Sequence, residues 1–428
     1  MKKERNWAGN YLYSTTVVHA PENVEQVQEL VARSGKLRVL GTRHSFNGIA
    51  DCSGALLSLQ KLNRVIELDR FRHKVTVEAG IRYGELCRYL HSNGYALHNL
   101  ASLPHISVAG ACATATHGSG DRNGNLASAV HSLEVVTADG ETAVFSRGQS
   151  NGEFYGAVVG LGGLGAVTKI TLDVVPAFHV SQHVYENLPL ARLEEHFDDI
   201  FSSAYSVSLF TDWTASAFNQ VWVKRKLPEP LKQASSVEAE REFFGAASAD
   251  GLRHPVPGIS AENCSEQLGI PGPWYERLPH FRMDFTPSAG EELQSEYFVA
   301  RKDVYQALLA LDRLKERISP LLYISEIRTI AADELWMSPC YKQDTAAFHF
   351  TWKPDWEAVR QVLPAIEEQL APFGARPHWG KLFTMPPARL HSLYEKLPDF
   401  RELLLRYDPQ GKFRNAFMEK YIMGDGIE

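Results

Sequence analysis

The sequence predicts an α+β fold in two domains, and three observations carry this prediction. The chain has 428 residues, and a domain usually holds roughly 100–200. Short runs rich in Val, Ile and Leu fill residues 1–176, whereas aromatic-rich strands begin after this point. Later, residues 294–383 follow the order β-α-β-β-α-β of a ferredoxin-like sheet. We therefore expect a first domain over 1–176, a second over 177–376, and a segment 377–428 that returns to the first.

The first domain is expected to contain short strands and one clear helix. Residues 83–94 predict a helix closed by an Asn-Gly pair, and 133–145 predict a hairpin around an Asp-Gly turn. The motif Gly160–Gly165 matches G-x-G-x-x-G, but a helix-like run precedes it and a strand follows. This is the reverse of the dinucleotide-binding order, so we interpret the motif as a helix-to-strand turn. Strands are predicted at 37–41, 55–59, 64–69, 74–80 and 165–177.

The second domain is expected to begin with aromatic-rich strands. Residues 227–262, rich in Pro, Ala, Ser and Glu, are interpreted as a long surface excursion, and no internal repeat is visible. Strands are predicted at 205–213, 220–226, 294–300, 323–330, 345–352 and 376–383, and helices at 301–318 and 355–373.

Composition excludes several functional classes. The formal net charge is −7, and no basic stripe or juxtamembrane basic cluster indicates nucleic acid or a membrane surface. The five cysteines are scattered without a C-x-x-C pair, which argues against disulfides and zinc and fits a reducing compartment. The first residues carry charge but no apolar run, and no run of about 20 apolar residues exists. We expect a cytoplasmic protein, a monomer, without a metal.

Two segments of small residues have the composition of an anion-binding site. Residues 41–47 directly follow a predicted strand, and residues 102–120 are almost entirely small, with interspersed hydroxyls. Small side chains let backbone amides approach a pyrophosphate closely. A tightly packed structural loop is the alternative, which the length of the second segment disfavours.

Five motifs follow one another along the chain. They are GTRHSFN (41–47), ASLPHISVAGACATATHGSG (101–120), LGGLGAVTKITLD (161–173), HWGK (378–381) and GKFRNAF (411–417). Together they resemble the vanillyl-alcohol oxidase superfamily of flavoproteins (the vanillyl-alcohol oxidase/p-cresol methylhydroxylase fold type), and within it the alditol oxidases. The resemblance covers nearly the whole chain, and it implies a two-domain FAD-linked oxidase with a ferredoxin-like substrate domain.

The resemblance implies a covalent FAD, joined through its 8α-methyl group to His44. Where relatives often carry glycine before this histidine, the chain has Arg43, which changes the local charge. Relatives with a second, cysteinyl link carry Cys near the position of Leu103, so a single link is expected. The residues expected to hold FAD are Val39, Leu40, Gly41, Thr42, Arg43, His44, Ser45, Ser102, Ser107, Gly110, Thr114, Ala115, Thr116, His117, Val167, His378 and Asn415.

Three predicted strands of the second domain each place polar side chains on one face. Period-two alternation puts Glu326 with Arg328, and His349 with Thr351, while Lys381 shares a face with Trp379. One such pair is consistent with a simple ion pair or a solvated sheet face. The coincidence over three strands favours a lined pocket.

Such a pocket suits the oxidation of an alcohol, because fixed cations stabilise the negative charge that develops on the substrate oxygen. A pocket rich in hydrogen-bonding groups suits a polyhydroxylated substrate. By the resemblance, the expected catalytic residues are Arg328, Lys381 and His349, and the expected substrate-binding residues are Ser102, Glu326, Arg328 and Thr351.

Three functions remain open. The first is an oxidase that converts alditols such as xylitol and sorbitol at the terminal carbon to aldoses, with O2 reduced to H2O2. The second is a sugar-1,4-lactone oxidase or dehydrogenase of the same superfamily. The third is a non-catalytic flavin- or sugar-binding protein. A metal site formed by His105 and His117, or by His378 and His349, is disfavoured because the histidines lack zinc-site spacing.

Overall fold

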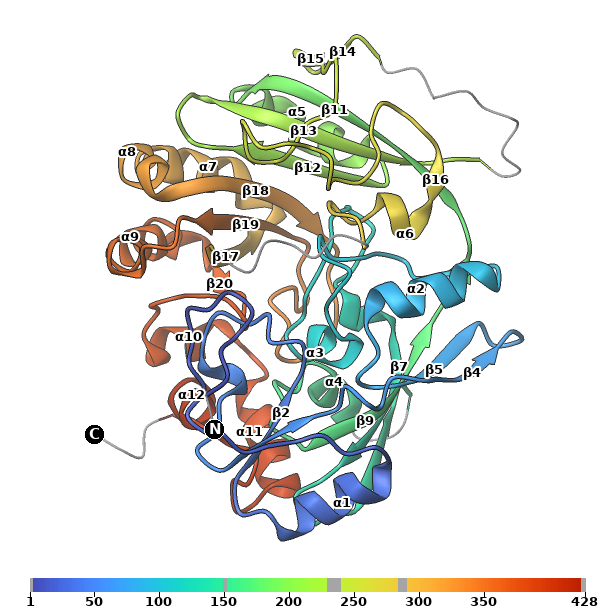
Figure 1. Cartoon of the computed structure of the whole chain (residues 1–428). Coiled ribbons are helices and arrows are strands. Elements are labelled where there is room, and N and C mark those ends of the chain that lie inside the picture. Colours follow the sequence, from blue (N-terminus) through green and yellow to red (C-terminus); the bar gives the residue numbers. More distant parts are fainter. Residues whose placement is uncertain (1–2, 149–151, 229–239, 284–290, 425–428) are drawn as a thin grey trace.

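The computed structural model describes residues 3–148, 152–228, 240–283 and 291–424. It has two layers of β-structure: small sheets in the lower half of Figure 1, and one large sheet in the upper half. The mixture of helices and sheets confirms the α+β class. No helix among the described residues is long and apolar enough to cross a membrane.

The lower half contains a three-stranded parallel sheet and a five-stranded antiparallel sheet. Alternation of buried and half-buried residues along β9 shows that the second sheet packs one face onto the core. The small sheet has the order β1 (Val18–His19), β3 (Ala55–Ser58), β2 (Leu37–Leu40), and the larger one β4 (Val65–Asp69), β5 (Lys74–Glu78), β9 (Ala166–Asp173), β7 (Val130–Val136), β8 (Thr142–Ser146). The helices here are α1 (Val24–Arg33), α2 (Tyr83–Ser92), α3 (Val108–Ala113) and α4 (Glu153–Val158), and β6 (Tyr95–Ala96) pairs with β10 (Val175–Pro176).

The G-x-G-x-x-G motif forms the predicted helix-to-strand turn, because it lies between α4 and β9. Leu161, Gly162 and Gly165 have positive φ values of 52°, 69° and 148°. The buried guanidinium of Arg38 holds the turn by donating to the carbonyls of Leu161 (2.8 Å) and Gly162 (2.9 Å). The turn is therefore a structural bend fixed against β2.

The ten-stranded upper sheet contains the predicted ferredoxin-like unit. Its strands have the antiparallel order β18-β19-β17-β20, which is the 2-3-1-4 order of that fold. Helices α7 and α9 pack against each other, and α7 also packs on β17. The elements are β17 (Leu293–Ala300), α7 (Val304–Asp312), α8 (Lys315–Ile318), β18 (Leu322–Ile330), β19 (Thr345–Trp352), α9 (Trp356–Gln369) and β20 (Arg376–Pro377).

A second unit of the same order precedes it, although the sequence shows no repeat. Its strands follow the antiparallel order β15-β11-β13-β12, and β12 joins β18 to make one continuous sheet. Equivalent strands of the two units thus meet at the centre. The elements are β11 (His179–Pro189), α5 (Arg192–Ser202), β12 (Ser206–Thr211), β13 (Ala217–Lys226), β14 (Glu242–Phe243), β15 (Ala246–Ser248), β16 (Gly272–Pro273) and α6 (Trp274–Arg277).

Two sequence predictions about elements were wrong, and a third was incomplete. The helix predicted over 301–318 is interrupted between α7 and α8. The excursion predicted over 227–262 lies partly outside the described residues, but β14 and β15 extend the sheet edge and His254 lines a cavity. The strand predicted over 376–383 stops at Pro377, because the chain then turns away from the sheet ladder: Gly380 O accepts from Phe46 N (2.7 Å) of the lower half, whereas His378 N and Leu382 N still bond to β17.

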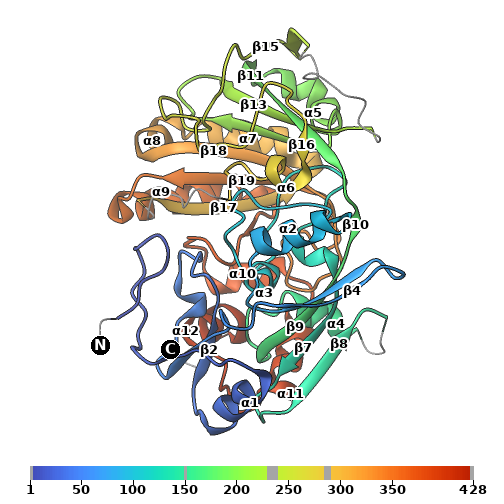
Figure 2. The same ribbon diagram turned by 45° about the vertical axis from the view of Figure 1, so that its right-hand side comes forward.

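The C-terminal segment packs on the lower half of the molecule, as Figures 1 and 2 show for α11 and α12. Helix α11 contacts α4. Lys412 Nζ donates to the carbonyls of Val31 and Ala138, both at 2.6 Å, and Arg38 donates to Phe413 O. The helices are α10 (Pro387–Leu393), α11 (Leu397–Tyr407) and α12 (Ala416–Met418). The domain boundaries at 176 and 376 remain a proposal, which these contacts support.

Candidate active site

A cavity of ≈ 1320 Å³ lies between the lower half and the large sheet. Its lining includes the loop after β2, the segment 101–117, and side chains of β17, β18 and β19. Drug-sized ligands occupy pockets of about 300–1,000 Å³, so this cavity has room for a large cofactor together with a small substrate.

The lower wall is made mainly of backbone and small side chains. A Cβ atom added to Gly41 or Gly110 would lie 2.9 Å or 2.7 Å from Ser107 Oγ. Thr42 Oγ1 accepts from Ser107 N (3.2 Å), which ties the two small-residue segments together. Among the described residues, the amides of 42–45 have no protein acceptor. This wall therefore offers free amides at a surface too close-packed for larger side chains, as a pyrophosphate site requires.

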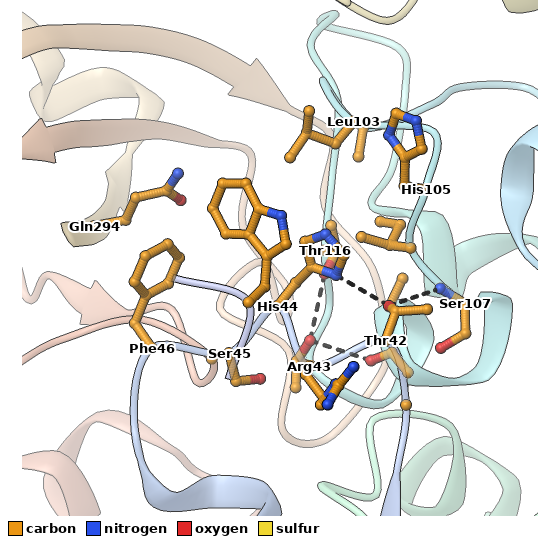
Figure 3. Close-up of a pocket in the computed structure, with 18 of the residues that line it drawn as sticks. Thr42, Arg43, His44, Ser45, Phe46, Leu103, His105, Ser107, Thr116 and Gln294 are labelled. Atoms are coloured by element: carbon orange, nitrogen blue, oxygen red, sulfur yellow. Dashed lines mark hydrogen bonds between the residues drawn. The ribbon is translucent and has the colours of Figure 1, made fainter. Parts of the chain in front are cut away.

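His44 is presented from this wall into the cavity (Figure 3). Its ring stacks on Trp7, with ring centroids 5.3 Å apart, and its Nδ1 lies 3.1 Å from Thr42 Oγ1. Burial lowers the pKa of His44 to about 4, so the imidazole is neutral at pH 7 and keeps a nucleophilic nitrogen. Arg43 has a positive φ of 65° and forms an ion pair with Glu4, so its charge is partly neutralised.

The upper wall is a row of charged side chains across the large sheet. Register places Glu326 opposite His349, and His349 opposite Glu296. Arg328 lies two residues beyond Glu326 on the same strand face, and its Nη1 donates to Ser102 Oγ at 3.3 Å. Glu326, Arg328, His349 and Thr351, which the alternation placed on shared strand faces, all line the cavity.

Glu296 of β17 is the centre of this charged wall. Its Oε1 accepts from Arg328 Nη2 (3.0 Å) and lies 3.2 Å from His117 Nε2, while its Oε2 accepts from Lys381 Nζ (2.7 Å). Burial raises the pKa of Glu296, but the charges of Lys381 and His117 outweigh burial and hold it well below its usual range. An ionised Glu296 therefore fixes both cations, Arg328 and Lys381.

Lys381 reaches the wall from a loop that the lower half positions. Asn47 Nδ2 donates to the carbonyls of Trp379 (2.9 Å) and Lys381 (2.8 Å). The ammonium lies 2.6 Å from His349 Nδ1, and His349 Nε2 lies 3.1 Å from Thr351 Oγ1. Burial lowers the pKa of Lys381, and it lowers that of His349 to about 4, so His349 is neutral beside the lysine.

Most residues predicted for the cofactor line this one cavity, and two do not. Ala115 is buried at a positive φ of 55° outside the lining. Asn415 also lies outside it: its side chain donates to the carbonyls of Gly48, Ile49 and Asp51 and caps α12. The predicted residues that line the cavity are Val39, Leu40, Gly41, Thr42, Arg43, His44, Ser45, Ser102, Ser107, Gly110, Thr114, Thr116, His117, Val167, His378 and Lys381, besides the four on the strands.

Sequence reasoning missed three charged or polar residues of the upper wall and its support: Glu296 and His280 line the cavity, and Lys224 lies behind it. Glu296 lies on a correctly predicted strand. A single carboxylate within an otherwise uncharged strand was the sequence feature that could have indicated its role. His280 comes from a loop, and Lys224 lies on β13 in the other half of the sheet, so no local pattern linked either to the site.

Comparisons with known proteins agree with this geometry. Residues 15–146 match the family model of an FAD binding domain, and residues 290–421 match that of D-arabinono-1,4-lactone oxidase. The chain is 48% identical over 422 residues to the alditol oxidase of Streptomyces sp., covering 98% of this chain and 99% of that protein. The chain belongs to the alditol oxidase family. The L-gulono-1,4-lactone dehydrogenase of Mycobacterium tuberculosis is 27% identical, over 97% of this chain and 98% of that one.

Among solved structures, the cholesterol oxidase of B. sterolicum has a TM-score of 0.78 at 16% identity. The match covers 98% of this chain and 96% of that one. At this identity the likeness establishes the fold alone, and it confirms the FAD-linked oxidase fold expected for the family.

Proposed function

We propose that this protein is an FAD-dependent oxidase that converts alditols, with xylitol and sorbitol as expected substrates, to aldoses at the terminal carbon. The observation that carries the proposal is the charged wall of Glu326, Arg328, His349 and Lys381 facing the small-residue wall that bears His44. Family membership supports the same chemistry. The wall has more hydrogen-bond donors and acceptors than one reacting hydroxyl can use. A substrate with several hydroxyl groups would occupy the rest.

The lower wall fits FAD on structural grounds. The amides of 42–45, which have no acceptor among the described residues, suit a pyrophosphate, and the absence of side chains at Gly41 and Gly110 lets it approach the backbone. We propose that His44, neutral and lining the cavity, is the covalent attachment point. When bound, FAD would take the hydride from the carbinol carbon and pass two electrons to O2, giving H2O2.

In this proposal the upper wall handles the substrate's charge and proton. Arg328 and Lys381 stabilise the developing alkoxide, and removal of one such group typically costs about 2.7–4 kcal/mol. The hydroxyl proton passes to the pair formed by His349 and Lys381, whose Nδ1 and Nζ lie 2.6 Å apart and can share it. Glu326, Thr351 and Ser102 bind the remaining hydroxyls, because each lines the cavity with a free hydrogen-bonding capacity.

A sugar-1,4-lactone oxidase or dehydrogenase is the second candidate. The match of residues 290–421 to the lactone oxidase model favours it, since this range holds most of the charged wall. The higher identity and full coverage of the alditol oxidase relative favour the first.

The deciding experiment uses the purified holoprotein with xylitol and with L-gulono-1,4-lactone. Anaerobic xylitol is expected to bleach the flavin absorbance, and peroxide is expected to form when air is admitted. Bleaching by the lactone alone would transfer the assignment to the second candidate. Bleaching by neither would contradict both.

A further inference from the structure

Glu326 is held from behind by two buried residues outside the predicted site. Its Oε1 lies 2.7 Å from His280 Nε2, and His280 Nδ1 lies 3.2 Å from Lys224 Nζ. Both side chains are buried, His280 at 6% and Lys224 at 1% exposure. Burial of a lysine is unfavourable, because removing an ammonium from water costs free energy unless the ammonium is fully hydrogen-bonded.

The ring of His280 has one fixed orientation. It follows α6, and its backbone N–H donates to Ser102 O (3.2 Å). The rings of Phe210 and Trp222 pack against it edge-on, with centroids 5.6 Å and 5.1 Å away. Which ring nitrogen faces Glu326 is thus set by packing, and the remaining variable is which nitrogen carries the proton.

The partners of Lys224 decide the position of that proton. Its Nζ donates to the carbonyls of Leu278 and Pro279, and its third direction faces His280 Nδ1. An ammonium has three donors and no acceptor, so Nδ1 must accept. Burial lowers the pKa of His280 to about 4, so the ring is neutral and its single proton lies on Nε2, which donates to Glu326.

We propose that Lys224 is a positioning residue: it holds His280 as the Nε2–H tautomer, and His280 thereby fixes Glu326 as an ionised acceptor for a substrate hydroxyl. The substrate part of this inference rests on the proposed function. Burial raises the pKa of Glu326, but the charge of Arg328 and the hydrogen bond from His280 lower it below its usual range, in agreement with an ionised acceptor.

The charged groups around Lys224 determine the pH at which its role can be tested. Burial lowers its pKa to about 7; Glu326 opposes this shift, while Arg328 and Arg277 reinforce it, and Cys264 and His280 are the other titratable neighbours. At pH 6 the ammonium form predominates, so experiments at this pH examine the intact arrangement.

The first experiment needs no substrate. ¹⁵N-histidine NMR of the holoprotein at pH 6, with His280→Asn to assign the signal, is expected to show His280 as the Nε2–H tautomer. Lys224→Met is expected to populate the Nδ1–H tautomer, whereas Lys226→Met, an exposed lysine on the same strand, leaves the spectrum unchanged. An Nδ1–H tautomer in the unaltered protein would overturn the proposal, even where Lys224→Met does not fold.

The second experiment measures kinetics with xylitol. Lys224→Met is expected to lower kcat/KM about 10–100-fold, chiefly through KM, since a hydrogen bond to a charged group contributes about 1.5–3 kcal/mol. His280→Gln, whose amide reaches the Nε2 position, is expected to retain more activity than His280→Asn. In a Glu326→Gln background, Lys224→Met should add little.

Additive losses, or equal losses in both His280 variants, would show that the pair serves only the fold and would overturn the proposal. Absence of turnover in the unaltered protein would instead contradict the proposed function. The tautomer measurement would still decide the role of Lys224 in that case.

Discussion

The two walls of the cavity are built by different physical means. The lower wall presents backbone amides between small residues, and Gly41 and Gly110 leave no room beside Ser107. The upper wall presents charged and polar side chains from β17, β18 and β19, and ion pairs with Glu296 fix Arg328 and Lys381. A backbone-lined wall is sensitive to side-chain size, whereas a side-chain wall is sensitive to charge. Substitutions in the lower wall should therefore affect mainly the binding of the flavin, and substitutions in the upper wall should affect mainly the rate of turnover.

The largest effect is expected at His44, the proposed attachment point in the lower wall. His44→Ala should abolish covalent flavin attachment completely, because no other atom replaces the imidazole nitrogen. After acid precipitation, yellow colour should stay in the pellet of the unaltered protein and appear in the supernatant for the variant. His105→Ala, which removes another cavity histidine, serves as the control and should keep its flavin in the pellet. Free flavin from the unaltered protein would contradict the proposed link.

The next effect tests the charge of the upper wall. Lys381→Met and Arg328→Ala should each lower kcat/KM by about 10²–10³ while FAD stays bound, because each removes a cation that stabilises the transition state. The measurement is peroxide formation at equal flavin absorbance. Lys302→Met, an exposed lysine, is the control. Loss of flavin in either variant would show instead that these residues maintain the fold.

The difference between the walls also explains what the sequence revealed. The two small-residue segments of the lower wall are contiguous motifs, so the sequence could identify most of the residues predicted to hold the cofactor, and only Ala115 and Asn415 lie outside the lining. In the upper wall, period-two alternation correctly placed Glu326 and His349 on the cavity face. Lys381 was predicted for the wrong reason, since it lies on a loop held by Asn47 rather than on a strand.

Contacts between elements that are distant in the sequence could not be predicted from it. Glu296 is central only because β17 pairs with β19 and because Lys381 and His117 arrive from other segments. Lys224 reaches the site because β12 of one ferredoxin-like unit pairs with β18 of the other. Local patterns carry no information about such pairing, and the second unit itself had no recognisable repeat.

A smaller effect concerns substrate length. Diols such as ethylene glycol should show kcat/KM lower than xylitol by on the order of 10², because unpaired buried groups of the upper wall cost about 1–3 kcal/mol each. Initial peroxide rates with ethylene glycol, glycerol, xylitol and sorbitol measure this. Equal values for glycol and xylitol would contradict a wall that binds several hydroxyls.

The smallest effect is expected from adding one methyl group to the lower wall. In Gly110→Ala, the new Cβ would lie 2.7 Å from Ser107 Oγ, closer than van der Waals contact allows. Overpacking of this kind costs roughly 1–3 kcal/mol, and the gain of alanine over glycine in a helix, about 0.5–1 kcal/mol, offsets only part of it. Flavin content and Tm should therefore fall modestly, while kcat per bound flavin stays unchanged because the charged wall is untouched.

A second substitution identifies the cause of that loss. Ser107→Ala in the Gly110→Ala background removes the hydroxyl that the new methyl group meets, so Tm should recover. Gly35→Ala, where nothing lies within 4 Å of the added Cβ, is the matched control and should change neither flavin content nor Tm. If Gly110→Ala instead lowered kcat per bound flavin as strongly as Lys381→Met, the two walls would not act separately: the lower wall would also set the geometry of the reacting groups.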